Sequence, residues 1–390
     1  VFKVWLLLFF TCKHEGNFKL HPFRKKPVLM ELNSSNLCND TVAWIWLSSL
    51  QPPFLAIISI LGVLGNSLVL CVFCLQRKPC SVADVYLGNL AAADLIMVLC
   101  LPFWTVTIAQ GYQWNFSQLL CKVICTAISM NYYCSILFLV LVSVDRYLAL
   151  AKPMNPSKLR YPKVAKSICV VIWMVGFVLS LPTLLFRRVG FFPFIGVDAC
   201  YLEYPHPAWV LQRNITTNFV GFLLPLPIIS LCTFHVVRAL KNRGLVIQPR
   251  VQTERKAAQL VLTVLTVFLL CWTPFQLVQF LETLDYFQLI PGCLWENVLQ
   301  IGNELATYLG YSNSAINPFL YVIVGSHFRK RAQGVFQGLL CSSRKSNSSV
   351  HLNVTVISKC GDSPKDKRIT PLELRAVYPP IKPHMMCRSL

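Results

Sequence analysis

Charged residues are scarce in this chain: only 13% of its 390 residues are Asp, Glu, Lys or Arg, whereas 55% are hydrophobic. A soluble globular domain carries about 25% charged residues, so the composition excludes an ordinary soluble protein. Acidic residues are especially few, with 16 Asp and Glu against 36 Lys and Arg. The resulting net charge of +20 needs no nucleic acid as a partner, because an anionic membrane leaflet attracts basic loops equally well.

The chain also lacks the groupings that mark an enzyme or a metal centre. Its 7 histidines are scattered and show no metal-ligand spacing, and most of its 17 cysteines lie inside apolar segments. The sequence has no internal repeat and no pair of broken apolar segments in matching positions, which a transporter built from repeats would show. We therefore expect no enzymatic activity and no metal cofactor, and a channel or transporter remains a lesser alternative.

Long apolar runs are what the sequence has in abundance. About 20 mostly apolar residues cross a bilayer as a helix, and we expect seven such helices: Pro53–Leu75, Val85–Ile108, Leu119–Ala149, Val164–Phe186, Val210–Val237, Ala257–Leu284 and Val298–Val324. This predicts an all-α membrane protein, a seven-transmembrane helix bundle over residues 53–324. Residues 325–341 predict a short amphipathic helix at the cytoplasmic membrane surface.

Charge patterning predicts the orientation of the bundle. The loops after the first, third and fifth segments are strongly basic, as is the stretch after the seventh, which is typical of cytoplasmic loops. We therefore expect a multi-pass plasma-membrane protein with an extracellular N-terminal region, residues 1–52, and a disordered cytoplasmic tail, residues 342–390. Residues 1–12 are either part of a signal segment or an artefact of the gene sequence.

Several modification sites follow from this orientation. Asn-x-Ser/Thr triplets in segments placed outside predict glycosylation at Asn33, Asn39, Asn115 and Asn214. Cys121 and Cys200 both lie on the outer side, where a disulfide is allowed, and Cys38 with Cys293 forms a plausible second bridge. Cys341 ends the amphipathic stretch and is a candidate for palmitoylation. Serines of the tail are candidates for phosphorylation.

Polar groups inside the apolar segments carry the functional prediction. Asp94 lies in the second segment, Asp145-Arg146-Tyr147 ends the third, and Asn317-Pro318 lies in the seventh. A charge in mid-membrane costs about 2.5–3.5 kcal/mol on insertion scales and is kept only when it faces a bundle interior. This pattern indicates a receptor bundle.

The motifs in register resemble those of the rhodopsin-like (class A) G-protein-coupled receptors. They are Gly65-Asn66, Leu90-Ala91-Ala92-Ala93-Asp94, Asp145-Arg146-Tyr147, Trp173, Cys271-Trp272-Thr273-Pro274 and Asn317-Pro318-Phe319-Leu320-Tyr321. Longer pieces, such as Gly221-Phe222-Leu223-Leu224-Pro225-Leu226 and Gln252-Thr253-Glu254-Arg255, are similar to the bradykinin receptors, the type-2 subtype first. The resemblance implies a receptor for short cationic kinin-like peptides that couples to a Gq-type G protein, raises calcium, and is regulated by receptor kinases and arrestin. A different cationic peptide remains an alternative.

The expected ligand site has an acidic rim and a cation. Glu296, Gln300 and Glu304 stand one turn apart on one helix face, and Glu282 matches an acidic position of the resembled family. Such a rim attracts a cationic ligand, although a merely solvated rim would look the same. The resemblance implies that Arg187, or else Arg188, binds the peptide carboxylate. The expected pocket lining is Trp104, Phe275, Gln276, Gln279 and Tyr311.

Two internal sites complete the sequence-based expectations. Oxygen atoms of Asp94, Ser135, Asn313 and Asn317 would bind an allosteric sodium ion; the alternative is a hydrogen-bonded aspartate without an ion. An ion pair between Arg146 and Glu254 would hold two helix ends together by about 0–1 kcal/mol. The residues expected to switch during G-protein coupling are Asp145, Arg146, Tyr147, Glu254, Trp272, Pro274, Asn317 and Tyr321.

Overall fold

The structure is a computed structural model that describes residues 41–76, 79–150, 161–193, 196–242, 249–290, 292–325 and 328–338. Several predicted features lie outside these residues: the segment 1–12, Asn33, Cys38, Asn39, Cys341 and the tail serines. The side chains of Glu254, Cys293 and Glu296 are not described either.

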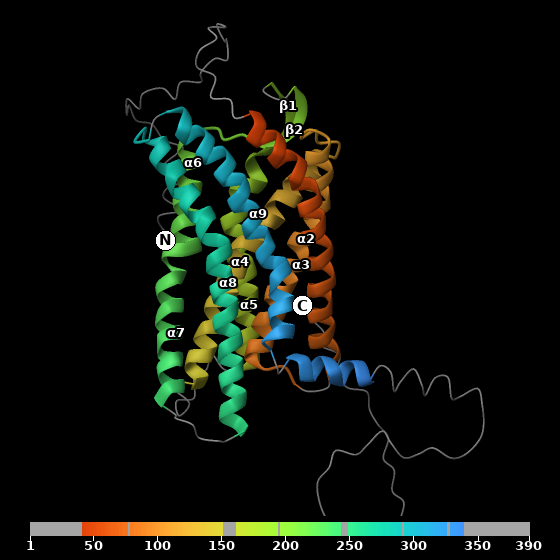
Figure 1. The fold of residues 1–390 in the computed structure, drawn as a ribbon, viewed down its shortest axis with the longest axis vertical. Coiled ribbons are helices and arrows are strands. Elements are labelled where there is room, and N and C mark those ends of the chain that lie inside the picture. Colours follow the sequence, from red (N-terminus) through yellow and green to blue (C-terminus); the bar gives the residue numbers. More distant parts are fainter. Residues whose placement is uncertain are drawn as a thin grey trace, which may run out of the picture.

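Among the described residues, seven helical segments form the bundle, one of which consists of three consecutive labelled elements (Figure 1). They are α2 (Thr41–Leu75), α3 (Val82–Ala109), α4 (Gln118–Leu150), α5 (Pro162–Phe186), the continuous run α6 (Ala208–Asn218), η2 (Phe219–Leu223) and α7 (Pro225–Asn242), then α8 (Pro249–Tyr286) and α9 (Cys293–Ile323). Between α5 and α6, β1 (Arg187–Phe192) and β2 (Val197–Leu202) pair antiparallel, from Arg187 opposite Leu202 to Phe192 opposite Val197. We call the end that carries these strands the hairpin end.

A further helix, residues 328–338, lies at the opposite end and projects sideways from the bundle (Figure 1). It lies within the stretch predicted to be amphipathic. Arg331 attaches it to the first turn of α3, where its guanidinium lies 2.6 Å from a carboxylate oxygen of Asp84. The same carboxylate accepts hydrogen bonds from the backbone amide and hydroxyl of Ser81, the N-cap of α3.

Most helices extend beyond the predicted segments. α2 begins at Thr41 and contains Pro52 and Pro53, where the apolar segment was expected to start; α8 begins at Pro249 and α9 at Cys293. The predicted limits followed apolarity, whereas backbone hydrogen bonding in a helix continues wherever side chains permit it. Among the described residues, six helical spans are long and apolar enough to cross a membrane, and α9 is not one of them. Its polar residues, such as Glu304 and Asn313, explain its lower apolarity.

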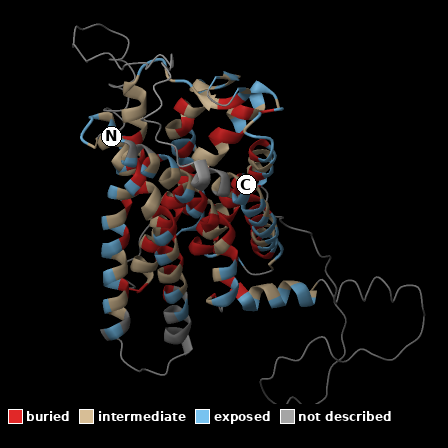
Figure 2. Ribbon diagram, turned by 45° about the horizontal axis from the view of Figure 1, so that its top comes forward, coloured by how far each residue is buried: buried red, intermediate tan, exposed pale blue. Residues whose placement is uncertain are grey.

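The core lies along the bundle axis, and apolar side chains also cover the outside. Figure 2 shows buried residues gathered on the inner faces of the helices, while large apolar residues such as Leu64, Val170 and Leu231 are exposed. This distribution suits a lipid environment, where outward-facing apolar side chains cost nothing. Close helix contacts use small residues: a Cβ at Gly65 would lie 2.8 Å from Pro318 of α9.

Candidate functional site

The β1–β2 hairpin is held over the bundle by the start of α4. Cys121 of α4 is disulfide-bonded to Cys200 of β2, which confirms the first predicted bridge. Gln118, one turn earlier, accepts a hydrogen bond from the Val189 amide at 2.6 Å and donates to the Arg187 carbonyl at 2.9 Å. The hairpin is therefore fixed to α4 through both of its strands.

Beneath the hairpin lies a cavity of about 340 Å³. Its walls come from α3, α4, α5, α6, α8 and α9, and Leu202 of β2 borders it as well. Six of the nine residues predicted to bind ligand line it: Trp104, Arg187, Phe275, Gln279, Glu304 and Tyr311. The structure thus brings together residues that stand up to 207 positions apart in the sequence, Trp104 and Tyr311 (311 − 104).

Glu282, which was predicted to bind ligand, is paired with a cation in this structure. It is absent from the cavity lining, and its carboxylate lies 3.1 Å from the guanidinium of Arg213 on α6. Gln279 donates to the same oxygen at 3.1 Å. Arg213 itself lines the cavity and was missed by sequence reasoning. Its presence in an apolar segment was the available signal, because an intramembrane cation marks a functional position by default.

Gln276 also differs from its predicted role. It is buried, does not border the cavity, and donates a hydrogen bond to the Tyr132 hydroxyl behind the cavity wall. Tyr132 and Tyr133 border the cavity instead. The Tyr132 hydroxyl in turn donates a hydrogen bond to the Thr217 carbonyl at 3.1 Å, just before the π-helix η2.

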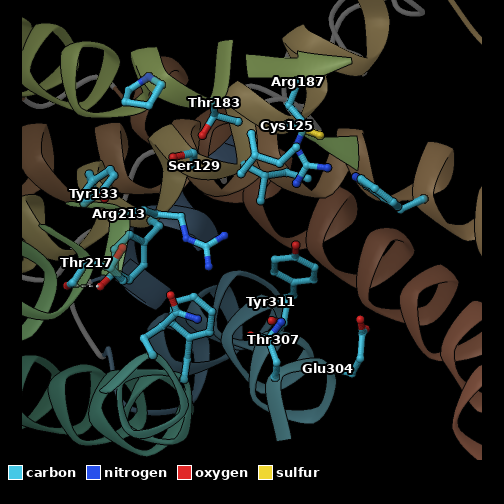
Figure 3. Close-up of a pocket in the computed structure, with 18 of the residues that line it drawn as sticks. Cys125, Ser129, Tyr133, Thr183, Arg187, Arg213, Thr217, Glu304, Thr307 and Tyr311 are labelled. Atoms are coloured by element: carbon cyan, nitrogen blue, oxygen red, sulfur yellow. Dashed lines mark hydrogen bonds between the residues drawn. The ribbon is translucent and has the colours of Figure 1, made fainter. Parts of the chain in front are cut away.

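The cavity contains charges of both signs. Figure 3 shows Arg187 and Arg213 turned toward its interior, with Glu304 on the α9 side. Arg187 donates to the Cys200 carbonyl at 3.1 Å, but its buried Nε has no hydrogen-bond partner. Glu304 accepts a hydrogen bond from Tyr308 at 2.9 Å. A ligand with a carboxylate at one place and a cation at another is therefore complementary to this cavity.

Tyr112, in the loop after α3, borders the same cavity. Burial, and secondarily the nearby Glu304 charge, raise the pKa of Tyr112 to about 12. The hydroxyl therefore stays protonated and serves as a donor to Gln51 of α2 at 3.1 Å.

A polar cluster surrounds Asp94 in the middle of the bundle. Asp94 is fully buried and accepts hydrogen bonds from Ser314 at 2.7 Å, Asn317 at 2.8 Å, Asn131 at 3.0 Å and Ser135 at 3.4 Å. Sequence reasoning missed Asn131 and Ser314. Asn131 was recognisable, because it stands one helical turn before Ser135 and so shares its face.

The predicted sodium ligand Asn313 makes no hydrogen bond to Asp94 among the contacts of the described residues. Its Oδ1 and that of Asn317 are buried without partners. Such oxygens, together with a carboxylate, are the donors that a hard monovalent cation uses. The residues present therefore fit a sodium ion.

At the end opposite the hairpin the bundle is closed. Leu150, Val236 and Ala258 form a buried cluster that joins α4, α7 and α8. Arg146 pairs with its neighbour Asp145 at 2.6 Å, while the side chain of Glu254 lies outside the described atoms. Arg146 and Thr233 border a cavity of only about 10 Å³, room for roughly one water molecule.

Aromatic packing connects the two ends. The Trp272 ring lies 4.7 Å from Tyr132, 5.8 Å from Phe275 and 6.2 Å from Phe268 between centroids. Pro274 lies inside α8 just after it, where the missing backbone donor permits bending. Tyr321 is buried near the far end of α9 and contacts Phe328 of the helix 328–338 at 6.3 Å.

The family described as "7 transmembrane receptor (rhodopsin family)" matches residues 65–321. The chain belongs to this family. It is similar to the B2 bradykinin receptor of Cavia porcellus, with 46% identity over 79% of this chain and 83% of that one. Identity to the B2 bradykinin receptor of Homo sapiens is 45%, over 76% of this chain and 77% of that one. Identity to the B1 bradykinin receptor of Homo sapiens is 38%, over 83% and 92% respectively.

These findings confirm the recognised family, with the type-2 subtype first, and the seven-helix membrane fold. The receptor is a multi-pass membrane protein and not an enzyme, as its family membership shows. Two sequons of the receptor lie among the described residues. Asn115 is exposed, so its amide is accessible to a glycan. Asn214 is 0% exposed and lies within α6, which overturns the expectation of a glycan there, because a buried nitrogen cannot carry an oligosaccharide.

Proposed function

We propose that this receptor binds a short cationic kinin-like peptide and transmits its binding to a Gq-type G protein, which raises intracellular calcium. The observation that carries the proposal is the mixed charge of the 340 Å³ cavity in a chain 44–47% identical to B2 bradykinin receptors over most of its length. The hairpin end faces the outside of the cell and the Arg146 end the cytoplasm, as the basic loops require.

Glu304 and the two arginines bind oppositely charged groups of the peptide. Glu304 accepts a peptide guanidinium, since it lines the cavity and has only Tyr308 as a recorded donor. Arg187 and Arg213 provide the cations for a peptide carboxylate. Arg187 is the better placed of the two, because its Nε lacks a partner and the Arg213 guanidinium already pairs with Glu282.

Coupling requires the closed end to open. In this structure the cavity beside Arg146 is far too small to admit a segment of a partner protein. A ligand shifts this equilibrium only through different affinities for the closed and open states. Contacts at Tyr132 and Trp272, which meet at the cavity floor, are suited to make that difference. Receptor kinases and arrestin then act on the tail.

The ligand assignment is tested by calcium release in cells expressing the receptor, across peptides with and without terminal arginines. Glu304→Gln should raise the half-maximal concentration of an Arg-containing kinin at least tenfold, because a guanidinium loses its buried carboxylate partner. The half-maximal concentration of an analogue that lacks the terminal arginines should be nearly unchanged by Glu304→Gln. The matched control is Glu203→Gln, since Glu203 pairs with Arg188 on the exposed hairpin. Equal losses for both peptides, or an equal loss in the control, would refute the assignment.

A sodium ion at Asp94 is proposed as an allosteric ligand that favours the closed state. The ion would supply positive charge to the buried carboxylate, and the partnerless oxygens of Asn313 and Asn317 would complete its shell. Replacing sodium chloride by choline chloride should therefore raise agonist affinity several-fold in the unmodified receptor. Asp94→Asn should bind agonist with an affinity that no longer depends on sodium. Retained sodium dependence in this variant would exclude Asp94 as the site.

A further inference from the structure

Three cysteine sulfurs meet where the hairpin joins α4. Cys121 and Cys200 form the disulfide, and the Sγ of the free thiol Cys125 lies 3.8 Å from that of Cys200. All three sulfurs lie within 4.8 Å of one another. Cys125 is buried, so its contact with the disulfide is built into the core of this end and is not a chance surface encounter.

Two cysteines of α4, Cys121 and Cys125, face Cys200 of β2. Cys121 and Cys125 are four residues apart on α4, so both side chains lie on the face that β2 covers. Thiol–disulfide exchange requires a thiolate in contact with a disulfide sulfur and an accessible in-line path. The 3.8 Å distance between Cys125 and Cys200 meets the contact requirement. The three sulfurs all lie within 4.8 Å of one another and so are not in line, and side-chain rotation must precede the attack.

A cation stands beside the third sulfur. Arg187 donates to the Cys200 carbonyl, and Arg187 and Cys125 both border the cavity. In Figure 3 the Cys125 sulfur lies next to the Arg187 side chain at the cavity wall. The buried Nε of Arg187 has no hydrogen-bond partner, so the Arg187 guanidinium can stabilise a thiolate at Cys125.

We propose that Cys125 exchanges with Cys121 for Cys200, so that the receptor exists as two disulfide isomers. The Cys125 thiolate attacks Sγ of Cys200; the Cys125–Cys200 bond forms and the Cys121–Cys200 bond breaks. Cys121 leaves as a thiolate and takes up the proton that Cys125 released. Disulfide and thiol counts are unchanged, so the step needs neither an oxidant nor a reductant.

The exchange changes the roof of the cavity. The Cys125 and Cys200 sulfurs must close from 3.8 Å to the disulfide length of about 2 Å, so linkage to Cys125 draws β2 toward the next turn of α4. Arg187 and Leu202, at the two strand ends that meet each other, border the cavity and would move into it. The second isomer should therefore bind ligand more weakly, an effect that rests on the proposed peptide-binding function, whereas the exchange itself does not.

Disulfide mapping of the full-length receptor tests the exchange directly. The purified protein is incubated at pH 8 with a low concentration of glutathione, alkylated with iodoacetamide without reduction, digested and analysed by mass spectrometry. We expect Cys200 linked to Cys121 and to Cys125 in separate peptides, with the Cys125-linked fraction rising at least twofold during incubation. Cys200 linked to Cys121 alone before and after incubation would overturn the proposal.

Two serine variants sharpen the test. In Cys121→Ser, Cys200 should be linked to Cys125, and an alkylated Cys200 would contradict the exchange. In Cys125→Ser, Cys200 should be linked to Cys121 alone at every time point. Cys134→Ser is the matched control, because Cys134 is a buried thiol of the same helix whose recorded contact is the Ile172 carbonyl; it should behave as the unmodified receptor does. If Cys121→Ser fails to fold, mapping of the unmodified receptor still decides.

Peptide binding separates this inference from the proposed function. If the receptor binds kinin-like peptides, incubation with glutathione should reduce high-affinity sites in proportion to the Cys125-linked fraction, and Cys125→Ser should prevent the loss. A receptor that binds no such peptide but shows both linkages would refute the proposed ligand while retaining the exchange.

Discussion

Tyr132 shows how one side chain can organise the contact between three helices. Its ring packs on Trp272 of α8, and its hydroxyl donates to the Thr217 carbonyl of α6 while accepting from Gln276 of α8. Gly221, within the π-helix η2, leaves the room that this hydroxyl fills: a Cβ there would overlap the Tyr132 hydroxyl. π-bulges in helices are frequent at functional sites, and here the bulge receives a tyrosine.

This fit predicts a coupled pair of substitutions. Gly221→Ala should destabilise the receptor by about 1–3 kcal/mol, because the added methyl group overpacks the core. Tyr132→Leu should relieve the overlap, so the double variant should be less destabilised than the sum of the two single variants. Thermal unfolding of the purified receptor measures each effect. Additive losses would show that Gly221 does not owe its role to Tyr132.

Prediction from the sequence was most successful for single residues that match a motif of the family. Asp94 and the Cys121–Cys200 bridge were identified in this way. The pairing of Glu282 with Arg213, 69 positions away, was not predicted, because contacts over such distances cannot be inferred from one sequence. The burial of Asn214 was missed for a related reason: a sequon carries no information about whether its segment is helical or packed.

Among the elements, the helix 328–338 is held by a nearly buried ion pair. The Arg331 and Asp84 side chains are 10% and 7% exposed, and Arg331 also donates to Gln76 at 2.6 Å. Removing one partner of a buried pair costs about 3–5 kcal/mol, since the other charge is left uncompensated. The ion pair therefore fixes this helix to the first turn of α3, and the contact with Gln76 fixes it to the segment after α2.

Double substitution at this pair tests the attachment. Asp84→Asn and Arg331→Gln should each lower the melting temperature and weaken G-protein coupling, and the double variant should lose less than the sum of both. Arg329→Gln is the control, because Arg329 lies on the same helix and donates to the exposed Val322 carbonyl. A loss in the control equal to that of Arg331→Gln would attribute the effect to general loss of positive charge.

The existence of the seven transmembrane elements followed from the sequence, but their limits did not. Apolarity marks the lipid-exposed length of a helix, whereas α8 begins at Pro249, about two turns before its apolar part. The π-helix at Phe219–Leu223 was not predicted, and the contact of Tyr132 with this region joins residues far apart in the sequence.

At the scale of the whole molecule, the receptor combines an accessible cavity at one end with a closed surface at the other. The cavity below the hairpin has a volume of about 340 Å³, and the separate cavity beside Arg146 has a volume of about 10 Å³. Buried side chains around Asp94 and Trp272 lie between them. Packed cores of this kind switch between discrete arrangements and do not deform continuously, which is why occupancy of one end can be detected at the other.

The central claim, that peptide binding at one end controls a G protein at the other, is tested most directly by nucleotide exchange. Purified receptor in lipid nanodiscs is mixed with a Gq-type heterotrimer, and exchange is measured with and without a kinin-like peptide while peptide binding is followed in parallel. The account predicts that the peptide accelerates exchange and that Arg146→Ala abolishes the acceleration while peptide binding persists. Peptide binding without any acceleration in the unmodified receptor, or full acceleration in Arg146→Ala, would contradict it.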